Sequence, residues 1–233
     1  MFCRPNFLSA AICSIGFTFS QASAQEVQAP SLDPGDKWTY QFSLDGVRQW
    51  DYTEAVRSVD GTTAVIVTTD SQGRRTIVTF DTPTHRYLIR YAVGRGGDGR
   101  GRILGDESAN SAPIKFPINL GDEWFVAYRF KVNGDSITQE FHAKVVGREA
   151  IRVAAGQFDV YKIEFNGFWQ NDEAIGFGGK ARQVETYWYS PSVKRFVRRE
   201  IKSYGTSLAK MAAAVIYWRV DELSQFSLVP AAK

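Results

Sequence analysis

The chain has 233 residues, with 28 Lys and Arg, 25 Asp and Glu, and a formal net charge of +3 at pH 7. This small charge excludes the strong basic excess that nucleic-acid binding requires. The two cysteines, Cys3 and Cys13, both lie in an N-terminal segment that we expect to be removed. A mature chain without cysteine excludes disulfides, thiol catalysis and cysteine-ligated metal sites.

The first 24 residues have the pattern of a secretory signal peptide. Arg4 supplies a cationic start, residues 7–19 are mostly apolar, and Ala22-Ser23-Ala24 is a small-x-small cleavage site. The apolar stretch is shorter than the about 20 residues that a transmembrane helix needs. We expect cleavage near Ala24, which leaves 209 residues with a charge of +2 in the periplasm or outside the cell, and no membrane span. Lipidation of Cys13 is the alternative.

After a polar lead-in over residues 25–33, we expect a single β domain over residues 34–229, because all-β domains of this length commonly stay undivided. Apolar and polar residues alternate with period two in eleven segments, and each predicts a half-buried strand. In chain order the segments are Trp38–Ser43, Val47–Val59, Thr62–Thr69, Thr76–Asp81, Arg86–Val93, Trp124–Val132, Ile137–Val146, Phe158–Phe168, Arg182–Ser190, Arg195–Ser203 and Ile216–Leu228.

Glycine-containing pairs between these segments predict tight hairpin turns, since glycine and asparagine tolerate positive φ. They are Asp45-Gly46, Asp60-Gly61, Gln72-Gly73 and Asn133-Gly134. One short helical stretch is predicted over Ser207–Ala214. The sequence therefore predicts an all-β fold: a single strongly curved antiparallel sheet of about 10–11 strands, a half-barrel or open barrel with little helix.

A four-residue motif occurs twice, as Gly35-Asp36-Lys37-Trp38 and as Gly121-Asp122-Glu123-Trp124, and each copy opens a predicted strand. The repetition suggests a sheet with two similar halves, the second of which begins near Pro117. Between the halves, residues 94–113 contain six glycines and three arginines. Long loops are either functional or disordered, so this Gly/Arg-rich loop is expected to be disordered or to bind an anionic surface.

A basic run over residues 194–202 contains five Lys and Arg residues. Such charge is typical of a solvated edge strand that resists aggregation. Contact with acidic groups of the cell envelope is the alternative.

Few residues offer metal or acid–base chemistry. His85 and His142 are the only histidines, and no zinc-protease or EF-hand motif occurs. We therefore expect no metal, no cofactor and no catalytic residues. A glycosidase would need two carboxyls about 5–9 Å apart in a cleft. Four acids fall on or between neighbouring predicted strands: Glu164, Asp172, Glu173 and Glu185.

Aromatic residues make up 14% of the chain and supply its main candidate site. They favour strands and fill cores, but a sheet with little helix to cover it either curls onto itself or leaves a concave face partly open. An open face of this kind would hold an apolar ligand. The candidate ligand-binding residues are Trp38, Tyr40, Trp124, Tyr128, Phe130, Phe158 and Trp188.

Four segments match, in order, the motifs of a known group: Gly35–Tyr40, Phe116–Trp124, Val153–Ile163 and Thr186–Val197. Glu222-Leu223 follow them near the end of the chain. In these segments the chain resembles the TapB-type exported bacterial proteins, a group of domains of unknown function. The resemblance covers most of residues 34–224. It implies a strongly curved antiparallel sheet, similar in outline to the half-barrels of the LolA and LolB lipoprotein carriers, and it implies no catalytic residues.

Together these features favour a non-enzymatic periplasmic β-protein that binds a hydrophobic ligand or lipid on a concave aromatic face and serves the maintenance of the cell envelope. The alternative is a structural or interaction protein of the envelope that docks a protein partner through an edge strand or the Gly/Arg-rich loop. A carbohydrate-active hydrolase is the third hypothesis.

Overall fold

The structure is a computed structural model that describes residues 26–84, 86–93, 102–104, 112–132, 135–172, 179–206 and 213–230. Twelve strands and a short 3-10 turn, η2 (Pro191–Val193), occur in these ranges. The strands are β1 (Lys37–Leu44), β2 (Val47–Asp60), β3 (Thr63–Asp70), β4 (Arg75–Asp81), β5 (Arg86–Val93), β6 (Arg102–Leu104), β7 (Glu123–Val132), β8 (Asp135–Val153), β9 (Gly156–Asn171), β10 (Lys180–Ser190), β11 (Arg195–Thr206) and β12 (Ala213–Ser227).

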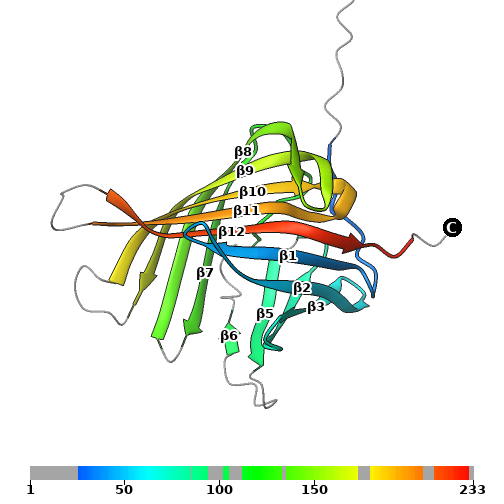
Figure 1. Ribbon diagram of the computed structural model, residues 1–233, viewed down its shortest axis with the longest axis horizontal. Coiled ribbons are helices and arrows are strands. Elements are labelled where there is room, and N and C mark those ends of the chain that lie inside the picture. Colours follow the sequence, from blue (N-terminus) through cyan, green and yellow to red (C-terminus); the bar gives the residue numbers. More distant parts are fainter. Residues whose placement is uncertain are drawn as a thin grey trace, which may run out of the picture.

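All twelve strands belong to one antiparallel sheet in the order β6-β5-β4-β3-β2-β1-β12-β11-β10-β9-β8-β7. The first and last long strands, β1 and β12, pair at its centre. The sheet curls so that β5, β6 and β7 lie below β12 and β1 in the view of Figure 1. Cα atoms of β6 and β7 come within 8 Å of each other, but no ladder joins them in the described residues. The predicted all-β, strongly curved, open sheet with little helix is confirmed.

The eleven predicted strands are all present, and three of the four predicted turns show the expected positive φ at Gly46, Gly61 and Gly73. The fourth turn, Asn133-Gly134, lies outside the described residues, as do the predicted signal peptide and His85. Strand β6 was not predicted: it falls inside the Gly/Arg-rich loop, most of which is also outside the described residues.

Two boundaries differ from the prediction. The expected helix over 207–214 is wrong at its end, because Ala213 and Ala214 pair with β11 as the start of β12, and its other residues lie outside the described ranges. Strand β8 continues seven residues beyond Val146 to Val153. A register shift between Val145 and Gly147 lets it stay paired with β9 after the alternation of its buried side chains has ended.

The two copies of the Gly-Asp-x-Trp motif make the same backbone contacts. Gly35 N donates to Val56 O, and Val56 N donates back to Asp36 O. In the second copy Gly121 N and Asp122 O pair in the same way with Val145. Both motif glycines have positive φ, 104° and 88°, which glycine adopts without strain. Each motif therefore fixes the start of one strand against its hairpin partner, as the predicted two-half arrangement requires.

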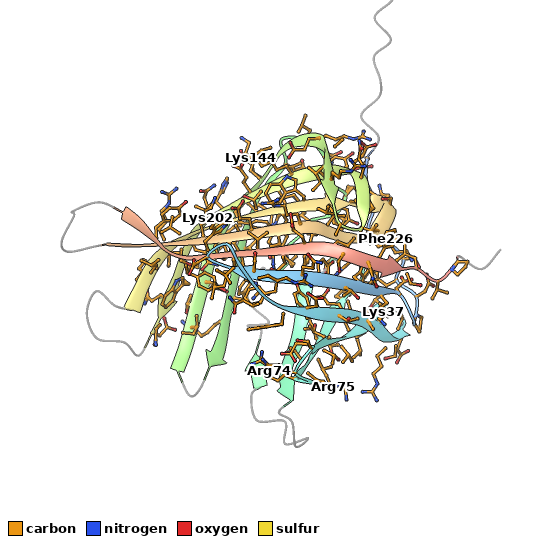
Figure 2. The ribbon with its side chains drawn as sticks, in the orientation of Figure 1. Lys37, Arg74, Arg75, Lys144, Lys202 and Phe226 are labelled. Carbon is orange, nitrogen blue, oxygen red and sulfur yellow. The ribbon has the colours of Figure 1, made fainter. Side chains whose placement is uncertain are left out.

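The enclosed space is filled by two hydrophobic clusters, and Figure 2 shows the side chains packed between the strands. The first centres on β1, β2 and the β10–β11 turn, and the second on β7–β10. The rings of Tyr187 and Phe196, 5.8 Å apart, join them. No described helix covers the second cluster. Instead the segment before β7 buries Ile114 and Ile118 against it, and Ile118 also bridges to Val27.

The basic run over residues 194–202 does not form an edge strand, so that prediction is wrong. Lys194 directly follows η2, and the rest of the run belongs to β11. This strand lies between β10 and β12 near the middle of the sheet. The cations of the run are tolerated there because each forms an ion pair. The acidic partners are Asp33 and Asp36 for Lys194, Glu54 for Arg195, Glu222 for Arg198, Asp221 for Arg199 and Glu200 for Lys202.

Candidate ligand-binding site

A pocket of about 370 Å³ opens on the inner face of the sheet, the face that carries the buried side chains of Tyr40, Phe165 and Tyr187. Four strands, β8 and β9 on one side and β11 and β12 on the other, supply its apolar walls, and β10 crosses between them. Ligand pockets are typically this large or larger, and mostly apolar with a few polar groups. The lining residues are Ile137, Trp169, Ile201, Ile216 and Tyr217, with Gln139, Gln183 and Ser203 as polar groups.

Next to the pocket along the sheet lies a group of charged side chains, which we call the charged cluster: Glu185, Arg199, Arg219 and Asp221. Side chains two residues apart on a strand share a face and lie about 7 Å apart. The ladders of β10, β11 and β12 therefore place pocket and cluster on neighbouring rungs of one face. The successive rungs are Gln183–Ser203–Tyr217, Glu185–Ile201–Arg219 and Tyr187–Arg199–Asp221.

Asp221 is the centre of the charged cluster, and its side chain is fully buried. Arg199 donates to its Oδ2 from Nε at 3.0 Å and from Nη2 at 2.8 Å. Arg219 donates from Nε to Oδ2 at 2.9 Å and from Nη2 to Oδ1 at 2.8 Å. One carboxylate thus holds two guanidinium groups, which are planar donors well suited to such forked contacts.

The charge states of these three groups follow from their pairing. Burial would raise the pKa of Asp221, but Arg199 and Arg219 outweigh it and hold that pKa below its ordinary value of 3.8. Burial acts to lower the pKa of each arginine, and the Asp221 carboxylate reverses this, so both arginine pKa values are raised. All three groups are therefore charged at neutral pH, and two positive charges face one negative charge.

Glu185 lies on the same face, but its hydrogen bonds are not with the two arginines. Its carboxyl accepts a hydrogen bond from Gln183 Nε2 at 2.6 Å and one from the side chain of Tyr187. In the described part of the chain it forms no ion pair within 4 Å. Burial is the largest influence on Glu185 and raises its pKa above the ordinary 4.5, although Arg199 opposes this. Glu185 therefore gives up its proton less readily than an exposed glutamic acid.

Three of the predicted ligand-binding residues, Trp38, Tyr40 and Phe158, lie in the first hydrophobic cluster. Trp38 Nε1 donates to Val193 O at 2.7 Å, and the Tyr40 hydroxyl donates to Phe196 O at 3.0 Å. Trp38 and Tyr40 have no exposed surface. Their polar atoms are satisfied within the core, so they connect β1 to the β10–β11 turn.

Two more, Trp124 and Tyr128, lie on β7 beside the second cluster. Trp124 Nε1 donates to Ala112 O at 3.3 Å. Tyr128 pairs in the ladder with Gln139 of the pocket, and Phe130 pairs with Ile137, although the side chain of Phe130 lies outside the described part of the structure. Strand β7 therefore places Tyr128 next to a residue that lines the pocket.

Trp188 lies on the opposite face of the sheet from Tyr187. It pairs with Lys162 and Arg198, whose cationic groups lie 6.0 and 5.3 Å from its ring, and its Nε1 donates to Glu149 Oε1 at 2.7 Å. The six predicted residues whose side chains the structure describes thus do not share one face, and none of these six lines the pocket. Their contact with a ligand stays a prediction.

The sequence reasoning missed the pocket and the charged cluster. A usable signal was present in β10, where Gln183, Glu185, Tyr187 and Tyr189 alternate in one phase. Two polar residues in the phase of buried aromatic residues indicate polar groups on the inner face. The Arg199–Asp221 ion pair of that face joins β11 to β12, and no local pattern of the sequence reveals this pairing.

Three of the four acids considered for hydrolysis lie in the described part of the structure, and Glu164 and Asp172 each pair with another residue. Glu164 pairs in the ladder with Thr186, so it projects from the face opposite Glu185 and forms an ion pair with Lys162 at 3.1 Å. Asp172 lies 3.4 Å from Arg129 Nε and accepts a hydrogen bond from Thr138. Glu173 lies outside the described residues.

Within the described ranges, no three His, Asp or Glu side chains are placed to hold a metal ion. His142 is exposed on β8 and lies 3.3 Å from Glu123. Across the same ranges, no helix has the length and apolar character needed to cross a membrane.

No protein-family model matches the sequence, and no curated protein matches it. Two solved structures are similar, each with a TM-score of 0.50 over 87% of this chain and 100% of its own. One, described as a lipoprotein, is from Parabacteroides distasonis and is 14% identical. The other, described as an exported protein with a YmcC-like fold, is from Bacteroides fragilis and is 16% identical. The resemblance to TapB-type proteins and to LolA and LolB stays a prediction, and the chain shares its fold with these two structures.

Proposed function

We propose that the mature protein is a non-enzymatic protein of the bacterial envelope that binds a small hydrophobic or amphipathic molecule in the inner-face pocket. The observation that carries this proposal is the pocket itself, with apolar walls from β8, β9, β11 and β12 and polar groups from Gln139, Gln183 and Ser203. This combination orients a ligand through a few hydrogen bonds while burying most of its surface.

The signal-peptide pattern and the descriptions of the similar structures support the envelope location. The sequence has the three parts of a signal peptide up to Ala24. The similar structures are described as a lipoprotein and an exported protein. The resemblance to TapB-type proteins implies a sheet similar in outline to the lipoprotein carriers LolA and LolB, and such a sheet is in keeping with a ligand of lipid character.

The proposal is tested by filling the pocket. Ser203 is buried on the pocket wall, so Ser203→Phe places a ring inside it. Thr186→Phe is the matched control, since Thr186 lies on the other face of β10. The ligand for the assay is N-phenyl-1-naphthylamine, a neutral hydrophobic dye whose fluorescence rises on leaving water. We expect the wild type and Thr186→Phe to bind the dye with equal affinity and Ser203→Phe to bind it at least tenfold more weakly.

Ile216→Arg provides a second variant that does not depend on a buried substitution, because Ile216 lines the pocket and is 58% exposed. A guanidinium at that position should also weaken dye binding. Circular dichroism and thermal melting establish that each variant folds. A wild type that does not bind the dye, or folded pocket variants that bind it as well as the wild type, would contradict the proposal.

The alternative function, docking of an envelope protein, is favoured by one observation on β7. This strand ends the sheet, and Phe125 on it is 52% exposed. A photo-crosslinker in place of Phe125 should then capture one specific envelope protein, and the same group in place of Val146 on neighbouring β8 should not. Equal capture at both positions would count against this alternative.

A further inference from the structure

The inner face carries cationic groups with N–H donors that the described residues do not use. A guanidinium has five N–H donors. In both Arg199 and Arg219, Nε and Nη2 bond to Asp221, while neither Nη1 atom has a hydrogen-bond partner among the described residues. Their side chains are 20% and 28% exposed although Asp221 between them is completely buried.

The pairing of β11 with β12 shows where these two arginines lie relative to the pocket. Arg219 lies on the rung next to the pocket residues, directly across from Ile201, which is itself a pocket wall. Arg219 also lies over the ring of Phe42, with its guanidinium carbon 4.7 Å from the ring centre. The stacked ring covers one side of the guanidinium. Arg219 therefore lies beside the pocket wall that Ile201 forms, and Arg199 lies one rung farther along the same face.

A second polar group on this face is without a partner. The Tyr52 hydroxyl is buried, the residue is only 7% exposed, and no described residue accepts or donates a hydrogen bond there. Tyr52 stacks on Tyr40 with ring centres 5.2 Å apart, and Asp221, Arg199 and Arg219 all lie within its electrostatic reach. Buried polar groups are almost always paired, so this hydroxyl indicates a missing polar partner beside the charged cluster.

The hydrogen-bonding groups of the charged cluster define the chemistry of that partner. Asp221 is shared by the two arginines, and Glu185 forms its hydrogen bonds with Gln183 and Tyr187. Two guanidinium groups with N–H donors that the described residues do not use, beside a hydroxyl that lacks a partner there, favour an anion that accepts hydrogen bonds. A planar carboxylate accepts such donors in pairs.

We infer that the site takes an amphiphile with a carboxylate head group, whose tail fills the apolar pocket and whose carboxylate is held by Arg219 and Arg199 beside Tyr52. The inference rests on the proposed function and adds the class of ligand. A volume of 370 Å³ corresponds to about a dozen water-sized groups, at roughly 30 Å³ each. That size matches a medium-chain fatty acid.

The test compares three ligands that share one tail and differ in head group. Decanoic acid, methyl decanoate and decylamine each compete with N-phenyl-1-naphthylamine for the purified wild-type protein at neutral pH. A hydrogen bond to a charged group contributes about 1.5–3 kcal/mol, so we expect the acid to bind at least about tenfold more tightly than the ester. The amine should bind more weakly than the ester.

Arg219→Met removes one guanidinium and leaves the Arg199–Asp221 pair in place, so the acid should lose its advantage while the ester binds as before. Tyr52→Phe should weaken the acid selectively. Lys202→Met is the matched control: it removes a cation from the opposite face of β11, between the pocket residues Ile201 and Ser203, and should leave the preference intact. Lys202 lies above the central strands in Figure 2.

The outcomes separate this inference from the proposed function. If the dye does not bind the wild type, the proposed function fails. If the dye binds but the wild type shows equal affinity for acid and ester, or prefers the amine, the carboxylate inference fails and the pocket remains. The wild-type comparison does not depend on the folding of any variant.

Discussion

At the scale of single residues, the inner face depends on a few charged groups in an apolar setting. Asp221 has no exposed side-chain surface and is held by two arginines. Removing one partner of a buried pair leaves an uncompensated charge, which costs far more than losing an exposed pair. The stability of the site and its electrostatics are therefore set by the same carboxylate.

Asp221→Asn should lower the free energy of unfolding by about 3 kcal/mol, because two arginines then share no carboxylate. Urea denaturation monitored by tryptophan fluorescence measures this. Asp51→Asn is the control, since the Arg48–Asp51 pair is exposed, with side-chain exposures of 61% and 40%. Its effect should stay within about 0.5 kcal/mol. If both variants lost the same free energy of unfolding, the buried Asp221 pairs would stabilise the fold no more than the exposed Arg48–Asp51 pair.

Glu185 should make stability depend on pH in the opposite sense to a salt-bridged acid. Its pKa is raised in the folded protein, so its stabilising contribution is complete below the ordinary value of 4.5. That contribution is lost as the pH rises from there through the raised folded value. Glu185→Gln does not titrate, so the melting temperature of this variant relative to the wild type should be higher at pH 8 than at pH 4. A difference that is constant or falls with pH would refute the assignment.

At the scale of elements, the aspartates of the two Gly-Asp-x-Trp motifs accept hydrogen bonds from different sets of residues. Asp36 has no exposed side-chain surface and accepts hydrogen bonds from Asp33 N, Val229 N and Lys194 Nζ. Asp122 accepts only from the backbone and side chain of Asn119 in the described residues. The first copy thus connects the start of β1 to the end of the domain and to the β10–β11 turn, whereas the second is a local cap.

Alanine at the two aspartates should separate these roles. Asp36→Ala should cost about 2–3 kcal/mol of unfolding free energy and Asp122→Ala about 1 kcal/mol, because more, and charged, donors lose their acceptor at Asp36. Chemical denaturation of both variants under the same conditions gives the comparison. A larger loss at Asp122 would contradict the unequal roles.

The strands were predictable because period-two alternation and glycine turns are local properties of the sequence. The extension of β8 to Val153 was not, since it depends on the register shift beside Gly147 and on pairing with β9. The position of β11 was not predictable either. Its charge indicated an edge, but its acidic partners, such as Asp221 and Glu54, are 22 and 141 residues away in the chain.

At the scale of the whole molecule, the sheet provides most of its own cover. Its curvature brings β5–β7 toward the central strands (Figure 1). The 112–118 segment buries Ile114 and Ile118 against the second cluster, and β8–β12 line the pocket. The aromatic residues that the sequence indicated as a binding face mainly fill the two cores. The pocket was not predictable because its lining residues come from five strands, β8 to β12, and no local pattern of the sequence shows which of them meet.

The central claim, that this pocket holds a ligand in the cell, is tested most directly by native mass spectrometry of protein extracted gently from the envelope. The wild type and Thr186→Phe should carry the same small amphipathic adduct, released on denaturation, and Ser203→Phe should not. Absence of an adduct from the wild type, or its equal retention by a folded Ser203→Phe, would contradict the claim.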